Sequence, residues 1–189
     1  MQRARKIENI ALIGFMGTGK TTVGHALAGL LHFQFLDTDD LIEHRAQQKI
    51  SDIFRTDGEA RFRELERQVV AELANCRRVI IATGGGLAAN GDNLASLQCH
   101  ALVVCLWASV ETIWERVRHQ THRPLLHDPD PRSKIERLLA ERAPFYRQAD
   151  VLVNTEVRSV REVAYHVAHQ YRVSRKLASG EIEHPTAGH

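Results

Sequence analysis

A glycine-rich segment near the start of the chain has the residue types and spacing that bind a nucleoside triphosphate. Residues 14–21 read GFMGTGKT, that is, a glycine, four residues, then Gly-Lys-Thr. Glycines let successive backbone N–H groups turn toward phosphate oxygens. Lys20 brings a positive charge to the outer phosphates, and the Thr21 hydroxyl suits magnesium. The segment predicts a phosphate-binding loop whose nucleotide contacts are Gly17, Thr18, Gly19, Lys20, Thr21 and Thr22.

The flanking residues supply the setting that such a loop requires. Residues 10–13 are apolar and are typical of a buried strand, and Val23, Leu27, Leu30 and Leu31 recur on one helical face. A strand, a glycine-rich loop and a helix in this order argue against an incidental glycine-rich turn. The following helix would add its positive N-terminal end to the phosphate site.

Two carboxylates follow the second predicted strand, residues 33–36. Asp37 and Asp39 are separated by one residue at the carboxyl end of that strand, the edge where ligands of parallel sheets bind. One carboxylate can hold the water shell of a metal, and the other can accept a proton from an attacking hydroxyl. The alternative is an Asx-type turn that only caps the next helix.

Several further residues are individually ambiguous. Arg63 could bind an anion, or it could be a surface arginine paired with Glu66 one helical turn away. Residues 84–86 are three glycines directly after a strand, which leaves the backbone bare for a close ligand. Arg123 and Arg147 are unremarkable alone.

The elements that must position these residues alternate along the chain. Apolar runs at 10–13, 33–36, 79–82, 101–107 and 151–153 are separated by helical patterns, which predicts a parallel sheet covered on both faces. We expect one domain over residues 1–172 and a disordered tail over 173–189. The aperiodic, proline-bearing residues from about 119 to 132 suit a lid loop. Capping boxes are expected at Thr56/Glu59 and Ser159/Glu162, and a helix from about Lys134 should end or kink near Pro144.

Composition excludes several classes of protein. The 189-residue chain is 43% hydrophobic and 25% charged, and its net charge of +2 gives no reason to expect nucleic acid or membrane partners. Cys76, Cys99 and Cys105 form no CxxC pair, which fits a reducing compartment and predicts a cytoplasmic protein. His119, His122 and His127 lack the supporting ligands of a zinc site.

Together these segments resemble the shikimate kinase family over about residues 9–171. The matching stretches are GFMGTGKTTVG, FLDTDDLIE, ISDIFRTDGEARFRELE, ATGGGL, RPLL and ERAPFYRQAD. The resemblance implies a three-layer P-loop kinase fold with a five-stranded parallel sheet and a lid loop. It implies a monomeric enzyme that uses ATP and Mg²⁺ to phosphorylate the 3-hydroxyl of shikimate, on the route to chorismate and aromatic amino acids.

The resemblance also implies roles for individual residues. Lys20, Asp39 and Arg123 would be catalytic, with Arg123 arriving with the lid. Arg116 and the stretch around Asn154 would lie near adenine. The remaining implied contacts are Asp39, Arg63, Gly85, Gly86 and Arg147 to shikimate, Arg116 and Arg123 to ATP, and Thr21 and Asp37 to magnesium.

Two other functions compete with this reading. A kinase for another small hydroxy acid such as gluconate would explain the loop and the lid. It would not explain why Asp-Thr-Asp at 37–39, the FRxxE pattern at 62–66 and the three glycines at 84–86 occur together. A non-catalytic nucleotide-binding module or switch would want a guanine-reading Asn-Lys-x-Asp segment or a lost active-site residue. The chain contains no such segment, and Lys20 and Asp39 are both present.

Overall fold

Five strands form one parallel sheet in the computed structural model, which describes residues 5–119 and 128–179. The strand order is β2-β3-β1-β4-β5, so β1 lies at the centre. The strands are β1 (Asn9–Ile13), β2 (Gln34–Asp37), β3 (Val79–Ala82), β4 (Ala101–Trp107) and β5 (Val151–Asn154). The helices are α1 (Lys20–Leu31), α2 (Thr38–Ala46), α3 (Ile50–Thr56), α4 (Gly58–Leu73), α5 (Gly91–His100), α6 (Val110–Val117), α7 (Pro131–Tyr146) and α8 (Val160–Ser179), with a 3₁₀ turn η1 at Leu87–Ala89.

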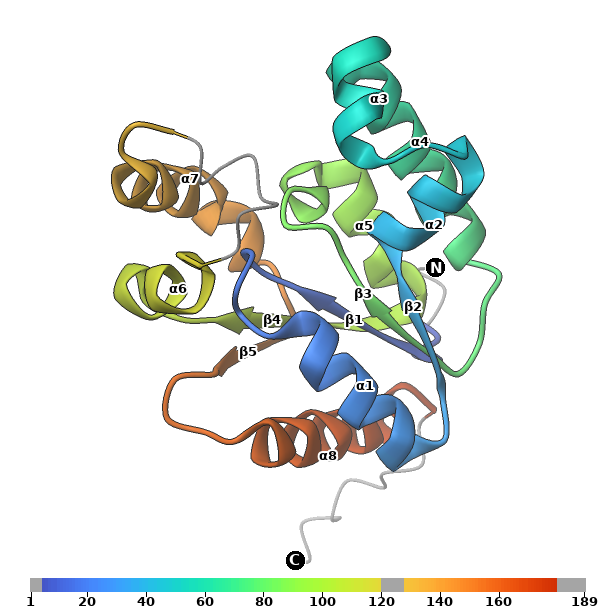
Figure 1. Ribbon diagram of the computed structural model, residues 1–189. Helices are drawn as coiled ribbons and strands as arrows, with labels where there is room; N and C mark the ends of the chain where they lie inside the picture. The colour runs from blue at the N-terminus through green and yellow to red at the C-terminus, as the bar shows by residue number, and fades with distance from the viewer. Residues whose placement is uncertain (1–4, 120–127, 180–189) are drawn as a thin grey trace, which may run out of the picture.

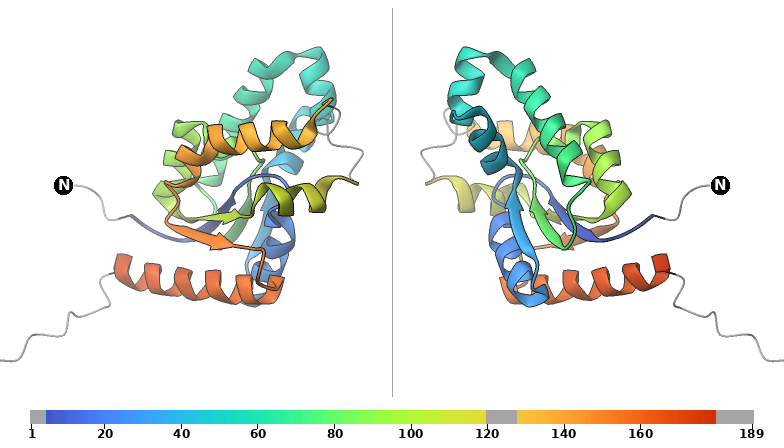
Figure 2. Two further views of the ribbon diagram at one scale, coloured as in Figure 1. Left: turned by 90° about the vertical axis from the view of Figure 1, so that its left-hand side faces the viewer. Right: turned by 90° about the vertical axis from the view of Figure 1, so that its right-hand side faces the viewer.

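Helices cover both faces of the sheet (Figure 1). Every residue of β1 is buried, and its side chains alternate between two apolar clusters. Ile10 and Leu12 pack with residues of α1 and α8, whereas Ala11 and Ile13 face the layer that contains α4, α5 and α7. The two views of Figure 2 likewise place α1 and α8 on one side of the sheet. This arrangement confirms the predicted three-layer α/β fold. Burial of β1 on both faces explains why residues 10–13 are all apolar.

The register brings the predicted site residues to one edge of the sheet. Asp37 lies level with Ala82 of β3, and Ala82 lies level with Leu12 of β1. All three strands run in the same direction, so the segments that follow them leave the sheet side by side. The glycine-rich loop, the acidic turn and the triple glycine are therefore neighbours.

Several elements differ from their predicted bounds. α2 begins at Thr38 because the Asp37 side chain caps it. The structure contains α5, which the sequence did not suggest, with Asn90 accepting hydrogen bonds from the backbone of Asp92 and Asn93. α7 is longer than predicted at both ends and passes through Pro144 without stopping. A proline in the last turn removes only one helical hydrogen bond, so the helix can tolerate it.

The ends of two other helices also differ from expectation. Thr56 does not cap α4. It lies in the last turn of α3, where its hydroxyl donates to the Asp52 carbonyl at 2.9 Å. The Ser159/Glu162 capping box is confirmed by reciprocal hydrogen bonds of 2.7 and 3.3 Å.

The predicted start of the tail was also too early. α8 continues to Ser179, so residues 173–179 are helical, and Ala178 packs against the cluster beneath α1. Residues 180–189, and residues 120–127 of the predicted lid, lie outside the described part of the chain. Among the described helices, none combines the length and apolar character needed to cross a membrane.

Candidate active site

The glycine-rich loop occupies the predicted place between β1 and α1. Gly19 precedes the helix with φ 93°, a conformation that glycine adopts without strain. At Gly17, the first carbon of a side chain would come within 2.7 Å of Val117 in α6, so only glycine lets α6 pack against the loop. The Lys20 ammonium donates to the carbonyls of Gly14 and Phe15, each at 2.9 Å. The lysine is therefore held over the concave face of its own loop.

Asp37 caps α2 with one carboxylate oxygen and brings the other near the Thr21 hydroxyl. One carboxylate oxygen accepts the backbone N–H of Asp39 at 3.0 Å and caps α2. The other lies 3.5 Å from the Thr21 hydroxyl. Burial raises the pKa of Asp37 above its ordinary value, and hydrogen bonding from Asp39 and the charge of Lys20 oppose this rise. A desolvated carboxylate beside a hydroxyl is a pair of hard oxygen donors that would gain from a divalent cation.

Asp39 packs against bare backbone at the triple glycine. A side-chain carbon on Gly84 would lie 2.5 Å from one Asp39 carboxylate oxygen, so any residue larger than glycine would displace the carboxylate. The Gly84 N–H donates to the buried Thr38 hydroxyl at 2.9 Å, which ties the end of β3 to the start of α2. Asp39 is consequently fixed between two strand ends and is only half-buried.

A cavity of about 540 Å³ connects these features, a size typical of small-molecule sites. It places the phosphate-binding loop on one continuous surface with Asp39 and Gly85. Its lining comprises Met16–Val23, Asp37, Asp39, Asp40, Thr83–Gly85, Arg116, Thr155, Arg158, Val160 and Val163.

Arg63 projects from α4 toward the triple glycine. Its guanidinium donates to Glu66 at 2.6 Å and to Glu59 at 3.0 Å. The predicted pairing with Glu66 thus exists, but Glu66 is only 1% exposed, so it is not a surface ion pair. Burial alone would lower the pKa of Arg63, yet the hydrogen bonds and charges of Glu66 and Glu59 outweigh it and raise that pKa. The two acids hold this guanidinium charged and oriented.

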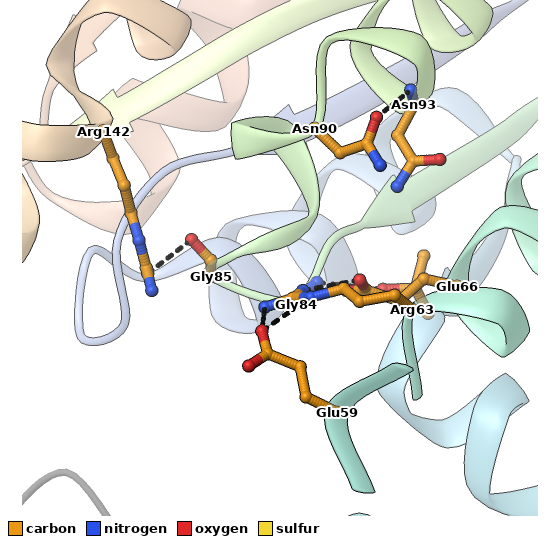
Figure 3. Close-up of polar contacts among 9 residues, drawn as sticks. Glu59, Arg63, Glu66, Gly84, Gly85, Asn90, Asn93 and Arg142 are labelled. Carbon is orange, nitrogen blue, oxygen red and sulfur yellow. Dashed lines mark hydrogen bonds and ion pairs between the residues drawn. The ribbon is translucent and has the colours of Figure 1, made fainter. Parts of the chain in front are cut away.

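A second arginine, which the sequence did not suggest, reaches the same glycines from the opposite side. Figure 3 shows Arg142 of α7 beside Gly85, while Arg63 approaches from α4. Arg142 donates to the Gly85 carbonyl at 2.9 Å and lies over the Phe15 ring at 5.4 Å. A side-chain carbon on Gly86 would lie 3.5 Å from the Arg63 guanidinium and 3.7 Å from that of Arg142. Two guanidinium groups therefore flank one bare residue.

Tyr146 holds the same carbonyl one turn further along α7. Its hydroxyl donates to Gly85 at 2.8 Å, and burial raises the pKa of this hydroxyl to about 12, so it remains a donor. Arg142 and Tyr146 are four residues apart and share a helix face. The fixed carbonyl keeps Gly85 and Gly86 in place between the two arginines.

Arg147 does not join this group, although the family resemblance implied a contact with shikimate. It is the residue at which α7 ends, it is exposed, and among the described residues its side chain has no hydrogen-bond or ion-pair partner. It lies five positions after Arg142, which turns it about 140° around the helix axis. The available signal was that Arg142 and Tyr146 share a four-residue spacing within ERAPFY.

The structure places Arg116 at the other end of the cavity. Its guanidinium donates to the Gly17 carbonyl at 3.2 Å and to the Thr155 carbonyl at 2.7 Å, which joins the phosphate loop to the end of β5. Arg158 lines the same wall and was not predicted. Asn154, two residues from Glu156, donates to its carboxylate at 3.0 Å. Arg123 lies outside the described residues.

Comparison with known sequences identifies relatives over nearly the whole chain. The model of the family described as shikimate kinase matches residues 16–172. A shikimate kinase from Thermodesulfovibrio yellowstonii is 40% identical over 175 residues, which is 93% of this chain and 99% of that protein. One from Caldanaerobacter subterraneus subsp. tengcongensis is 42% identical over 165 residues, covering 87% of this chain and 96% of the relative.

Solved structures agree with the sequence relatives. Shikimate kinase from Acinetobacter baumannii in complex with shikimate superposes with a TM-score of 0.84 at 38% identity, covering 92% of this chain and 97% of that one. A gluconokinase from Sinorhizobium meliloti 1021 covers 96% of this chain and 100% of its own, but its TM-score is 0.61 and its identity 17%. That second likeness shows the fold alone. The family match and the identity over most of the chain establish that this protein belongs to the shikimate kinase family.

Proposed function

We propose that this protein transfers the γ-phosphoryl group of ATP to the 3-hydroxyl of shikimate, a step toward chorismate and the aromatic amino acids. One observation carries the proposal: the guanidinium groups of Arg63 and Arg142 flank bare Gly86, next to Asp39 and the phosphate-binding loop. A small carboxylate that also presents hydroxyl groups matches this combination of paired arginines and one carboxylate.

The two arginines would bind the substrate carboxylate. A planar guanidinium meets both oxygens of a carboxylate at once, and two such groups fix its orientation as well as its position. Arg63 already donates hydrogen bonds to Glu66 and Glu59, and Arg142 donates one to the Gly85 carbonyl. These contacts preorganise the arginines, so less side-chain freedom is lost when the substrate binds.

Asp39 would hold the ring hydroxyls and accept the proton of the attacking one. As the 3-hydroxyl oxygen bonds to the γ-phosphorus, the bond from that phosphorus to the β–γ bridging oxygen breaks, and the hydroxyl proton passes to the Asp39 carboxylate. Lys20 and the backbone N–H groups of Gly17, Thr18 and Gly19 would neutralise charge on the phosphates. Thr22 and Arg116 would complete the nucleotide site. Arg123, from the lid segment, would add a positive charge at the transferring phosphoryl group.

The residues present fit a magnesium ion. The Thr21 hydroxyl and the Asp37 carboxylate converge to 3.5 Å, and burial of Asp37 without a cation raises its pKa. Oxygen donors of this kind suit Mg²⁺, which is bound through few protein ligands and substrate phosphates. When bound, Mg²⁺ would supply positive charge to the phosphate oxygens of ATP.

The direct test is ADP release from MgATP with shikimate or gluconate as separate acceptors. We expect release that depends on shikimate, with a rate on gluconate near the background of ATP alone. Lys20→Ala is the control, because it keeps the acceptor residues and should abolish turnover. Equal rates on both acceptors would contradict the proposed specificity. ATP binding without release on either would favour the non-catalytic nucleotide-binding module.

We also propose that the protein acts as a cytoplasmic monomer. The family resemblance motivates the oligomeric state, and the unpaired cysteine pattern motivates the compartment. Sedimentation velocity at micromolar concentration should give a single species near the 21.3 kDa chain mass. A species of twice that mass would contradict the monomer.

A further inference from the structure

A second cavity lies at the opposite edge of the sheet, where the strands begin. Its volume is about 560 Å³, close to that of the catalytic cavity. Four parts of the fold meet there: the residue before β1, the end of α1, the turn before β3 and one face of α8. The lining residues are Glu8, Leu30–Phe33, Arg77, Arg78, Tyr171, Arg172 and Arg175. None of them has a role in the proposed reaction.

The floor of this cavity is apolar and contains two aromatic rings in fixed positions. The Tyr171 side chain is buried at 4% exposure, and its ring meets the Phe33 ring edge to face with centroids 5.6 Å apart. The Tyr171 hydroxyl donates to the Glu8 carbonyl at 3.1 Å, so the ring cannot swing away without losing that bond. With Leu30 and Leu31 beside it, the half-buried Phe33 ring offers an apolar surface against which another flat ring can pack, and the buried Tyr171 ring supports Phe33.

The rim of the cavity is positively charged. Arg77, Arg78, Arg172 and Arg175 are all exposed and face a single carboxylate, that of Glu8. That carboxylate is already shared between Lys6 at 3.0 Å and Arg77 at 3.3 Å. Three of the four rim arginines therefore have no carboxylate partner among the residues that line the cavity. Exposed guanidinium groups without acids attract anions.

Arg78 is held over the apolar floor by its backbone. Its φ of 58° is left-handed, which is uncommon for a residue other than glycine. Two backbone hydrogen bonds fix the turn. The Arg78 N–H donates to the Glu8 carbonyl at 3.2 Å, and the Arg78 carbonyl accepts from the Gln34 N–H at 3.1 Å. The guanidinium consequently lies 5.5 Å from the centre of the Phe33 ring. A cation and an aromatic surface are thus juxtaposed before any ligand arrives.

We propose that this cavity, the distal cavity, binds a small organic anion in which a flat ring carries a carboxylate or a phosphate. The ring would pack on Phe33, which Tyr171 supports, and the anionic group would take hydrogen bonds from Arg78 and Arg175. The site is separate from the catalytic cavity, because α1 runs between them and its 12 residues span about 18 Å. Ligands of parallel sheets ordinarily bind at the carboxyl ends of the strands, so this site is additional to the fold's usual one.

The test is an NMR titration of backbone amides in ¹⁵N-labelled protein held saturated with MgADP and shikimate, which keeps probes out of the catalytic cavity. The probes are phenyl phosphate and benzoate, which share the ring but differ in the anion, and inorganic phosphate, which lacks the ring. We expect at least one ring-bearing probe to give saturable shifts at Phe33, Arg78 and Tyr171. Inorganic phosphate should bind about 10-fold more weakly or worse, because it gains nothing from the aromatic floor.

Matched variants decide whether the rim arginines are responsible. Arg78→Gln/Arg175→Gln should weaken the probe by about 10-fold or more, since two charge-assisted donors are lost. Arg67→Gln/Arg137→Gln makes the same change in net charge on α4 and α7, away from both cavities, and should leave binding unchanged. Shikimate phosphorylation by both double variants should match the unmodified protein, so this test stands apart from that of the proposed function. Absence of saturable shifts with both ring-bearing probes, or equal weakening in the control variant, would overturn the proposal.

Discussion

Replacement of Arg142 by alanine tests the central assignment of the acceptor site. Arg142 contacts the Gly85 carbonyl at 2.9 Å and the Phe15 ring at 5.4 Å. Its guanidinium also lies beside Gly86, opposite that of Arg63. The contacts with Gly85 and Phe15 stabilise the fold, and the position beside Gly86 would let the guanidinium bind the substrate carboxylate. A useful experiment must therefore separate loss of substrate binding from loss of stability.

The expected magnitude follows from the bonds lost. A carboxylate held by a forked guanidinium loses about 2–3 kcal/mol when that group is removed, which is a roughly 30- to 150-fold rise in the KM for shikimate. Loss of the Gly85 hydrogen bond and the Phe15 contact costs about 1–2 kcal/mol of folding free energy. In a chain of this size that lowers Tm by roughly 2–8 °C, so the variant should still be folded at 25 °C.

The assay is steady-state ADP release with shikimate varied at saturating MgATP, then with ATP varied at high shikimate. Arg142→Ala should raise the KM for shikimate and leave that for ATP within about two-fold, because the arginine lies on the acceptor side. Arg142→Lys keeps the charge but cannot donate two parallel hydrogen bonds to a carboxylate, so we expect an intermediate rise in the KM for shikimate. Arg147→Ala is the matched control and should change neither KM. A large rise in Arg147→Ala with an unchanged value in Arg142→Ala would refute the assignment.

Three further predictions concern single residues. Asp39→Asn should lower kcat by roughly 100-fold or more while the Kd for MgADP stays within about three-fold; near-normal turnover would remove Asp39 as the base. Asp37→Asn should raise the free Mg²⁺ needed for half-maximal turnover by about 10-fold, measured at fixed ATP, and an unchanged requirement would separate Asp37 from the metal. Burial, and then the charge of Arg5, lowers the pKa of His100 below its ordinary value. The unfolded chain therefore binds more protons, and stability should fall as pH drops below about 6.5. His100→Gln should show a smaller loss between pH 7 and 5 in urea unfolding, and an identical loss in both proteins would contradict the pKa assignment.

The sheet could be predicted because its three central strands are dominated by apolar residues: β3 and β4 throughout, and β1 from Ile10 to Ile13. Because β1 is buried on both faces, its residues 10–13 are all apolar, and such a run is easily recognised in the sequence. The sequence of α5 has no comparable pattern. Only Leu94 and Leu97 combine an apolar side chain with burial within its ten residues, and its cap, Asn90, reads equally well as part of a turn. Short helices that bury two apolar residues give too little periodicity to be recognised.

The phosphate loop and the acidic turn were predictable because their chemistry is local. Asp37 can both cap α2 and face Thr21, since a carboxylate has two oxygens and the two roles point in different directions. The burial of Glu66, in contrast, could not be predicted from local sequence. Its position in α4 predicts only a pairing with Arg63, and its 1% exposure depends on how α4 packs against the sheet. Burial makes that pair a means of orienting Arg63, and no short sequence pattern reports it.

Arg142 and Arg147 point in different directions because α7 continues past Pro144. An end at Pro144, one of the two outcomes predicted for that proline, would release the following residues from helical geometry, and Arg147 could then point toward the triple glycine. The helix instead continues to Tyr146, and the Arg147 N–H still donates to the Ala143 carbonyl at 3.0 Å. Helical geometry then fixes the consequence, because residues four apart share a face and residues five apart do not. Arg142 and Tyr146 both reach the Gly85 carbonyl, and Arg147 is turned away from it. Whether Arg142 or Arg147 reaches the triple glycine is therefore decided by whether one proline in the last turn of α7 is tolerated.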